Sequence, residues 1–142
     1  NNKFIKDTIL GNFEYIQLHG NETNERIKEI KLMGIKIIKA IKVKNETDVE
    51  NYKKYSDADI ILFDTPGMEK SIKFPEHLIS KLPKGDKFAL AGSISIDNIE
   101  SIANLGVTFC DLSSSLELDK QIGYKDHQKI KKFVKKINEL KN

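Results

Sequence analysis

Segments with the pattern of buried β-strands alternate along the chain with segments of helical periodicity. Each of five expected strands is followed by apolar residues at helical spacing. Because strands separated by helices pair in parallel, this order predicts an α/β fold with a parallel sheet and helices outside it. Such a sheet either closes into a barrel or stays open. The expected strands span residues 15–20, 35–43, 58–64, 88–91 and 107–110.

The composition of the chain limits the classes of protein to consider. Its 142 residues are enough for one domain with a hydrophobic core, so we expect one domain rather than two. The net charge is only +3, and the lysines are interspersed with Glu and Asp as on a solvated surface, which argues against a nucleic-acid partner. A single cysteine, Cys110, excludes an intramolecular disulfide framework and agrees with a reducing compartment. Because the sequence contains no long apolar run and no signal-peptide pattern, we expect a cytoplasmic protein with no membrane partner.

Residues 88–117 predict a strand, a helix and a second strand, with an open turn after each strand. The first strand runs into Gly92 and Ser93, and the second runs through Asp111 into the serines at 113–115. Both turns lie at the carboxyl ends of parallel strands. Backbone N–H groups there bind phosphate well when no large side chain covers them. This stretch therefore predicts an anion site, and two ordinary connecting loops remain the alternative on the turns alone.

Polar side chains follow each of the expected strands, and parallel strands bring them to one edge of the sheet. An acid directly after the apolar run Ile-Ile-Leu-Phe, Asp64, is best explained by a function at the mouth of the core. His19 alone is better explained as a hydrogen-bonded structural histidine, and Cys110 as a core residue. Together the polar groups indicate a site for a small phosphorylated substrate. They are Gln17, His19, Gly20, Lys39 or Lys42, Asp64, Gly92, Ser93, Asp111 and Ser113–Ser115.

Five short motifs give the chain a resemblance to a known enzyme family. They are YIQLHGNE at residues 15–22, LFD at 62–64, LAGSISIDNI at 90–99, DLSSSLE at 111–117 and GYKD at 123–126. Their order and spacing resemble phosphoribosylanthranilate isomerase, a (β/α)8-barrel (TIM-barrel) enzyme of tryptophan biosynthesis. The resemblance covers essentially the whole chain. It implies that residues 1–142 form a single partial TIM-barrel domain with the fourth to eighth strands, in a chain that is incomplete at its N-terminus.

The resemblance also implies a reaction, the Amadori rearrangement of N-(5-phosphoribosyl)anthranilate to 1-(2-carboxyphenylamino)-1-deoxyribulose 5-phosphate, without a metal or a cofactor. A general acid protonates the ring oxygen of the sugar, and a general base then removes the proton at C2. Asp64 matches the acid of the family. The other matching residues would bind the substrate, with the phosphate on the last four: Gln17, His19, Gly92, Ser93, Ser114 and Ser115.

Two functional residues of the family have no match in this sequence. One is the base, a cysteine that ends the first strand, and the other is an arginine from the second strand that helps to hold the anthranilate. Cys110 lies inside the last expected strand and does not match the motif of the base. We therefore expect residues 1–142 alone to be inactive.

Three turns depart from the family pattern. The glycine-rich loop after Asp64 keeps one glycine, Gly67, and serines stand for glycines in the turns at 92–93 and 114–115. A serine narrows the allowed backbone angles and adds bulk near a phosphate, although its hydroxyl supplies a donor. The changes fit a divergent active enzyme, which we favour, or a relative with an altered substrate or lost activity.

Two further hypotheses belong to other classes of protein. The first is a non-catalytic phosphate-binding relative, or a half-barrel that associates with a second copy or a missing N-terminal half, because a five-stranded piece leaves two unpaired edges. The second is another phosphosugar barrel enzyme, such as a relative of ribulose-phosphate epimerase or thiamine-phosphate synthase, which shares the two turns but not the QLHG motif.

Overall fold

The computed structural model describes residues 2–65, 74–92 and 94–140 of the chain. Every neighbouring pair of strands is parallel, and the order in the sheet is the order along the chain. The expectation of an α/β fold with a parallel sheet is confirmed. The sheet in the described residues consists of β1 (Tyr15–Leu18), β2 (Lys36–Lys42), β3 (Ile60–Asp64) and β4 (Phe88–Leu90).

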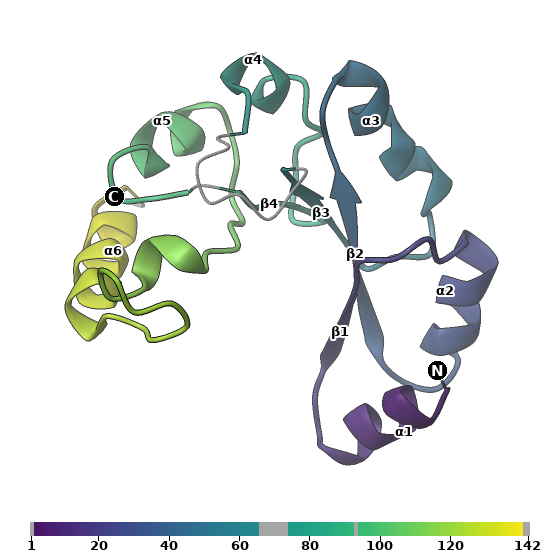
Figure 1. Ribbon diagram of the computed structural model, residues 1–142. Helices are drawn as coiled ribbons and strands as arrows, with labels where there is room; N and C mark the ends of the chain where they lie inside the picture. The colour runs from purple at the N-terminus through teal and green to yellow at the C-terminus, as the bar shows by residue number, and fades with distance from the viewer. Residues whose placement is uncertain (1, 66–73, 93, 141–142) are drawn as a thin grey trace.

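Helices connect the strands and lie along the outer side of an arc whose inner side is the sheet (Figure 1). Parallel strands need such crossovers, because the chain has to return to the starting edge before it can pair again. In the part of the chain that the structure describes, no helix is both long enough and apolar enough to cross a lipid bilayer. The helices are α1 (Asn2–Leu10), α2 (Asn24–Lys31), α3 (Glu46–Glu50), α4 (Glu76–Ile79), α5 (Ile99–Asn104) and α6 (His127–Leu140), with 3₁₀ turns η1 (Asn51–Lys54) and η2 (Ser114–Leu116).

Side-chain caps mark where several helices begin. The Thr23 hydroxyl accepts a hydrogen bond from the backbone at the start of α2, and Asn45 and Asp48 cap α3 reciprocally. Asp126 accepts two backbone N–H groups at the start of α6. Each cap satisfies donors that the first turn of a helix leaves open, so the helix begins at a defined distance from the strand before it.

The fifth expected strand, residues 107–110, is wrong as a strand and is reduced to a single bridge. Leu90 and Cys110 are parallel bridge partners, and the Leu90 N–H donates to the Phe109 carbonyl at 3.0 Å. The Asp111 N–H donates to the Leu90 carbonyl at 2.9 Å. β4 pairs all three of its residues with β3, but on its other side only Leu90 pairs. Thr108 and Phe109 of the segment are exposed, so a longer ladder there would bury little side-chain surface.

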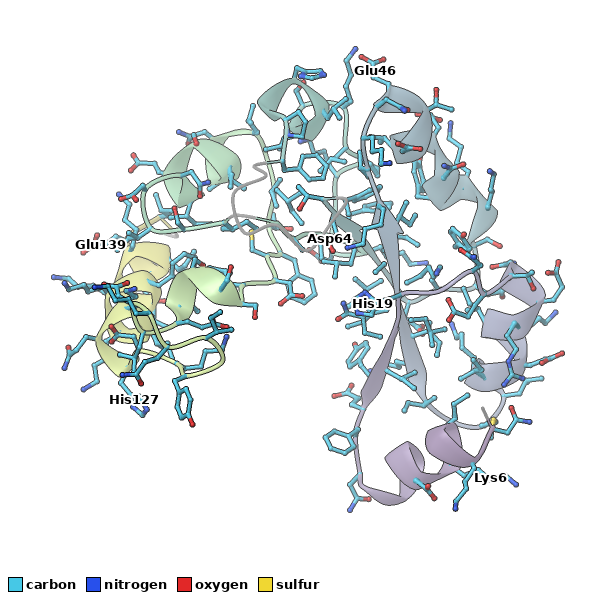
Figure 2. All side chains as sticks on the ribbon, in the orientation of Figure 1. Lys6, His19, Glu46, Asp64, His127 and Glu139 are labelled. Atoms are coloured by element: carbon cyan, nitrogen blue, oxygen red, sulfur yellow. The ribbon has the colours of Figure 1, made fainter. Side chains whose placement is uncertain are left out.

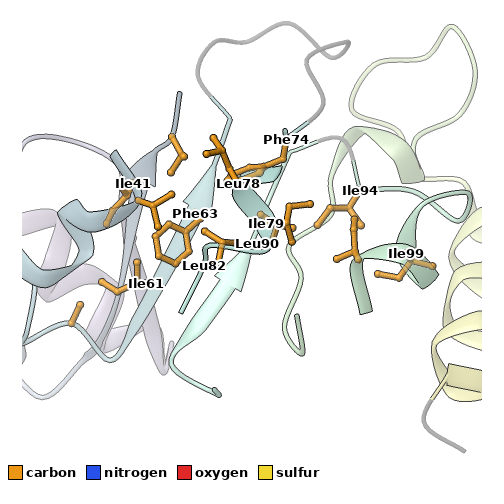
Figure 3. Close-up of a cluster of buried hydrophobic side chains, with 14 of the residues drawn as sticks. Ile41, Ile61, Phe63, Phe74, Leu78, Ile79, Leu82, Leu90, Ile94 and Ile99 are labelled. Atoms are coloured by element: carbon orange, nitrogen blue, oxygen red, sulfur yellow. The ribbon is translucent and has the colours of Figure 1, made fainter. Parts of the chain in front are cut away.

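Large apolar side chains fill the space between the sheet and the outer helices (Figure 3). Phe63 of β3 is fully buried, and its ring centre lies 6.2 Å from that of Tyr52 and 6.1 Å from that of Phe88. Smaller side chains line the inner face, since successive residues of a strand point to opposite faces. The inner cluster contains Ala40, Leu62, Ala89 and Ala91, with Ile38 and Ile60 half-buried beside it.

We expect replacement of Phe63 to be among the most destabilising single changes in the chain. Phe63→Ala removes a fully buried ring and leaves a cavity between β3 and the helices, at a cost of about 3–5 kcal/mol. Phe13→Ala is the matched control, because the Phe13 side chain is 65% exposed, and it should change stability by less than about 0.5 kcal/mol. Urea unfolding of both variants measures the difference. Similar losses in the two variants would contradict the assignment of the core to this face.

Candidate active site

The carboxyl ends of the four strands share one edge of the sheet, and the candidate functional residues gather there. Gln17 lies near the end of β1 and His19 directly follows that strand, while Lys42 ends β2 and Asp64 ends β3. Figure 2 shows the labelled side chains of His19 and Asp64 near the middle of the arc. The expectation that strand pairing brings these residues to one edge therefore agrees with the structure.

Asp64 is held by two neighbours at this edge. Its Oδ2 accepts a hydrogen bond from Lys42 Nζ at 2.5 Å, and its Oδ1 accepts from the Thr65 N–H at 2.8 Å. Lys42 Nζ also donates to the Thr65 carbonyl at 3.2 Å. The Asp64 side chain is 20% exposed and that of Lys42 is 48% exposed. A carboxylate with a fixed direction and partial access to solvent can contact a ligand at this edge.

Gln17 and His19 form a second pair at the end of β1. The side-chain nitrogen of Gln17 lies within hydrogen-bond distance of Nε2 of His19, at 2.9 Å. The His19 side chain is exposed, whereas Gln17 is half-buried. Both residues therefore lie where a ligand at this edge can reach them.

The two lysines considered for the end of the second strand have different positions. Lys42 lies at the edge, as described above, whereas Lys39 points to the outer face and is 1% exposed. Lys39 Nζ donates to the Gly20 carbonyl at 2.5 Å and to Glu22 Oε2 at 2.9 Å. It also lies 5.3 Å from the centre of the Tyr55 ring. Lys39 therefore supports the turn after β1 from beneath and does not line the edge.

The carboxyl group of Glu22 balances the buried charge of Lys39. Burial, the largest single effect, would raise the pKa of Glu22. The hydrogen bond and charge of Lys39, together with backbone hydrogen bonds, outweigh burial and hold the pKa of Glu22 below its usual value. Glu22 is therefore ionised in the folded chain at neutral pH, and the pair has no net charge.

The two small-residue turns occupy neighbouring positions along the edge. Gly92 comes two residues after Leu90 and the serines of η2 come soon after Cys110, and Leu90 and Cys110 are bridge partners. Gly92 has φ +95°, a left-handed backbone that favours glycine, and a Cβ there would lie 2.6 Å from Thr65 Oγ1. Ser114 and Ser115 are half-buried, while Ser93 lies outside the described residues.

Thr65 and Lys125 lie at this edge but are not among the site residues expected from the sequence. Thr65 is buried and contacts Asp64 and Lys42, and its side chain occupies the space beside Gly92. Lys125 Nζ donates to the Ser113 carbonyl at 2.8 Å and holds the start of η2. Both residues could have been found from their place in the sequence, because Thr65 directly follows Asp64 and Lys125 lies in the GYKD motif.

An apolar cavity of about 180 Å³ lies on the inner face beside the edge. Burial raises the pKa of the Cys110 thiol, which lines this cavity, to about 11. The thiol is therefore protonated at neutral pH and is neither a nucleophile nor a base. Across the described residues, no group of three or more His, Cys, Asp or Glu side chains has the arrangement of a metal site. The cavity is lined by Gln17, Ile38, Ile60, Leu62, Ala89, Phe109, Cys110 and Asp111.

The fold and the edge together define a class of protein. A parallel α/β sheet with an acid, a cation and two small-residue turns at its carboxyl edge is typical of proteins that bind a small anionic ligand there. The chain belongs to the N-(5'-phosphoribosyl)anthranilate isomerase family, whose model matches residues 5–136. The resemblance inferred from the five motifs is confirmed.

Individual relatives agree with the family assignment. The N-(5'-phosphoribosyl)anthranilate isomerase of Petrotoga mobilis is 38% identical to this chain over 135 residues, which cover 91% of this chain and 63% of the relative. The chain thus spans less than two thirds of the length of that relative. Monomers of the dimeric isomerase of Thermotoga maritima superpose with a TM-score of 0.75 at 27% identity, covering 97% of this chain and 67% of that chain. An isomerase in complex with reduced 1-(o-carboxyphenylamino)-1-deoxyribulose 5-phosphate superposes with a TM-score of 0.76 at 28% identity, covering 97% of this chain and 66% of that chain.

We expect Gly92→Ala to destabilise the chain by about 2–4 kcal/mol, because it adds a contact with the Thr65 side chain to the cost of a left-handed alanine. Gly123→Ala is the matched control. Gly123 has a similar φ of +86° with no atom within 4 Å of the added Cβ, so only the backbone cost of about 1 kcal/mol applies. Thermal unfolding of both variants gives the comparison, and equal losses would show that Thr65 does not crowd Gly92.

The Glu22–Lys39 pair predicts a pH-dependent stability. Because the pKa of Glu22 is lowered in the folded chain, the contribution of the pair is complete above about pH 4.5 and is lost as the pH falls through the lowered value. Glu22→Gln should cost about 3 kcal/mol at pH 7, where it leaves the buried ammonium without its partner, and clearly less at pH 3.

Urea unfolding at both pH values measures this difference. Glu29→Gln is the control, because Glu29 is 63% exposed in its pair with Arg26 and should contribute less than about 1 kcal/mol. A cost of Glu22→Gln that is the same at pH 3 and pH 7 would contradict the assignment of the charge pair.

Proposed function

We propose that the protein containing this chain is a phosphoribosylanthranilate isomerase of tryptophan biosynthesis. It would convert N-(5-phosphoribosyl)anthranilate to 1-(2-carboxyphenylamino)-1-deoxyribulose 5-phosphate in the cytoplasm. The observation that carries the proposal is an acid, Asp64, at the carboxyl end of a central strand in a chain of this family. The ligand of one similar isomerase, a reduced form of the proposed product, supports the same chemistry.

Asp64 is proposed as the general acid. It would give its proton to the furanose ring oxygen while the bond from that oxygen to C1 breaks and the nitrogen lone pair forms a Schiff base. The hydrogen bond from the Thr65 N–H fixes the direction of the carboxyl group. Removal of the proton at C2 then gives the enolamine, which tautomerises to the ketose product.

The substrate would be held at both of its ends without a metal or a cofactor. We assign the phosphate to the backbone and hydroxyl groups of the two small-residue turns, because both turns follow neighbouring segments at the carboxyl edge. Gln17 and His19 would contact the remainder of the substrate from the end of β1. The phosphate ligands are Gly92, Ser93, Ser114 and Ser115.

The base that removes the C2 proton is not assigned to any of the described residues. Cys110 is protonated at neutral pH because its pKa is about 11, so it does not take this role. We therefore propose that residues 1–142 alone do not turn over the substrate.

The barrel architecture is also part of the proposal. Residues 1–142 would form one partial TIM-barrel domain that supplies the fourth to eighth strands, with residues 107–110 in the place of the eighth. The small apolar residues on the inner face suit a barrel interior, which is filled by side chains. The outer edge of β1 has no partner strand among the described residues, so a further strand, from the N-terminal half of the barrel or from a second copy, would pair there.

The test of the proposed function is turnover by the full protein that contains this chain, followed as the loss of anthranilate fluorescence. Asp64→Asn should lower kcat by about 10²–10⁴-fold, the usual contribution of a general acid. Asp86→Asn is the control, because Asp86 is exposed and precedes β4 at the opposite edge of the sheet. An unchanged rate in Asp64→Asn would remove Asp64 from the mechanism, and no turnover by the unmodified protein would overturn the proposal.

A further inference from the structure

The Lys39 side chain is a buried cation that the proposed reaction does not use. It is 1% exposed and lies on the outer face of β2, where its neighbours Ile37 and Ile41 are also buried. A buried ion pair contributes little net stability compared with apolar side chains of similar volume, because both charges lose their hydration. Stability alone therefore does not explain a lysine at this position.

The hydrogen bonds of Lys39 lead to the turn that follows β1. In the sheet, Lys39 pairs in register with Leu18, the last residue of β1. From there its Nζ donates to the Gly20 carbonyl oxygen at 2.5 Å and to Glu22 Oε2 at 2.9 Å. Lys39 thus ties two points of the turn to the strand beside it.

Glu22 completes this connection from the far end of the turn. Burial would raise the pKa of its carboxyl group, but hydrogen bonds from Lys39 and from the backbone of Glu22 and Gly20 hold the pKa below its usual value. The carboxylate lies so close to Gly20 that a Cβ on that residue would be 2.7 Å from Glu22 Oε1. Both the N–H and the carbonyl group of Gly20 are therefore bound by the charge pair.

Gly20 directly follows His19, so the charge pair restrains the backbone from which the His19 side chain extends. The exposed imidazole of His19 lies at the carboxyl edge of the sheet (Figure 2), and its Nε2 is 2.9 Å from the side-chain nitrogen of Gln17. The buried pair on the outer face and the polar pair at the edge are thus connected through a single residue, Gly20.

We propose that Lys39 and Glu22 are positioning residues that hold the turn after β1, so that His19 and Gln17 meet the ligand in a fixed arrangement. The inference rests on the proposed function, in which Gln17 and His19 contact the part of the substrate away from the phosphate. Lys39 and Glu22 themselves do not touch the ligand. Their replacement should therefore change affinity only through Gln17 and His19, which distinguishes positioning from a general effect on the fold.

The test is a double-mutant cycle in the full protein that contains this chain. Calorimetric titration gives the Kd of reduced 1-(o-carboxyphenylamino)-1-deoxyribulose 5-phosphate. Lys39→Met/Glu22→Gln, the pair variant, removes both charges and leaves no buried ion without a partner, so its urea midpoint should stay close to that of the unmodified protein. The pair variant should weaken binding about tenfold, the usual contribution of one hydrogen bond. Gln17→Ala/His19→Ala should weaken binding at least as much.

The combination of all four substitutions gives the deciding measurement. Adding the pair variant to Gln17→Ala/His19→Ala should change Kd by less than about twofold, because the side chains to be positioned are gone. Losses that multiply in the combined variant, or a pair variant that binds like the unmodified protein, would overturn the inference while the proposed function stands. Failure of the unmodified protein to bind the ligand would overturn both.

Turnover provides a second readout that a loss of folded protein would not reproduce. The pair variant should raise KM about tenfold and leave kcat within about threefold, because Asp64 is held separately by Lys42 and the Thr65 N–H. A smaller amount of folded protein would instead lower the apparent kcat and leave KM unchanged, and that result would contradict the inference.

Gly20→Ala perturbs the same turn without removing a charge, and it decides the question should the pair variant not fold. Gly20 does not have a positive φ, and the nearest atoms to the added Cβ belong to the flexible end of the Glu22 side chain, so the fold should tolerate the change. Because the carboxylate has to move, we expect about threefold weaker binding, and no further loss in Gln17→Ala/His19→Ala. Unchanged binding in Gly20→Ala would contradict the inference.

Lys31→Met/Asp59→Asn is the matched control for the loss of a charge pair. Lys31 Nζ lies 2.8 Å from Asp59 Oδ1, and the two side chains are 35% and 27% exposed. Asp59 directly precedes β3, so this pair lies at the amino edge of the sheet, and asparagine keeps an acceptor for the Ile37 N–H. The control should leave Kd and KM within about twofold of the unmodified values. A loss as large as that of the pair variant would overturn the inference.

Discussion

The parallel pairing of β2 with β3 is the constraint on which the rest of the structure depends. Five residues of each strand pair in register, from Ile38 with Ile60 to Lys42 with Asp64. This register places Phe63 on the outer face beneath the helices and Lys42 opposite Asp64 at the carboxyl edge. A shift by one residue would exchange the two faces of a strand, so the core and the candidate site cannot be changed independently.

The two faces of the sheet have different roles: the outer face stabilises the fold, and the inner face leads to the candidate site. Large aliphatic and aromatic side chains on the outer face pack against the helices, and they form a larger buried cluster than the side chains of the inner face. The inner face carries alanines and partly buried isoleucines beside a cavity, and it ends in the polar edge. The candidate site therefore lies on one face of a sheet whose opposite face is packed against the helices. This support suits a site that has to hold a carboxylate in a fixed direction.

Two lysines of the same strand show how much depends on the face. Lys39 lies three residues before Lys42, and it points to the outer face, where Glu22 and the Gly20 carbonyl oxygen compensate its burial. Lys42 points to the inner face and keeps half of its side chain in solvent. The first lysine stabilises the turn after β1, whereas the second pairs with Asp64 at the carboxyl edge. The lysine-rich sequence of β2 left both residues as candidates for the edge, because it does not show which side of the sheet would be covered.

Local pattern and strand polarity alone determined the α/β class, the four strands of the described sheet and the edge at which Asp64 lies. The order of the motifs determined the family. The tertiary structure determined those features that depend on contacts between residues far apart in the sequence. It reduced residues 107–110 to one bridge at the edge of the sheet, where Thr108 and Phe109 stay exposed and gain little from pairing. It also paired Asp64 with Lys42, 22 positions earlier, since only strand register sets which side chains face each other.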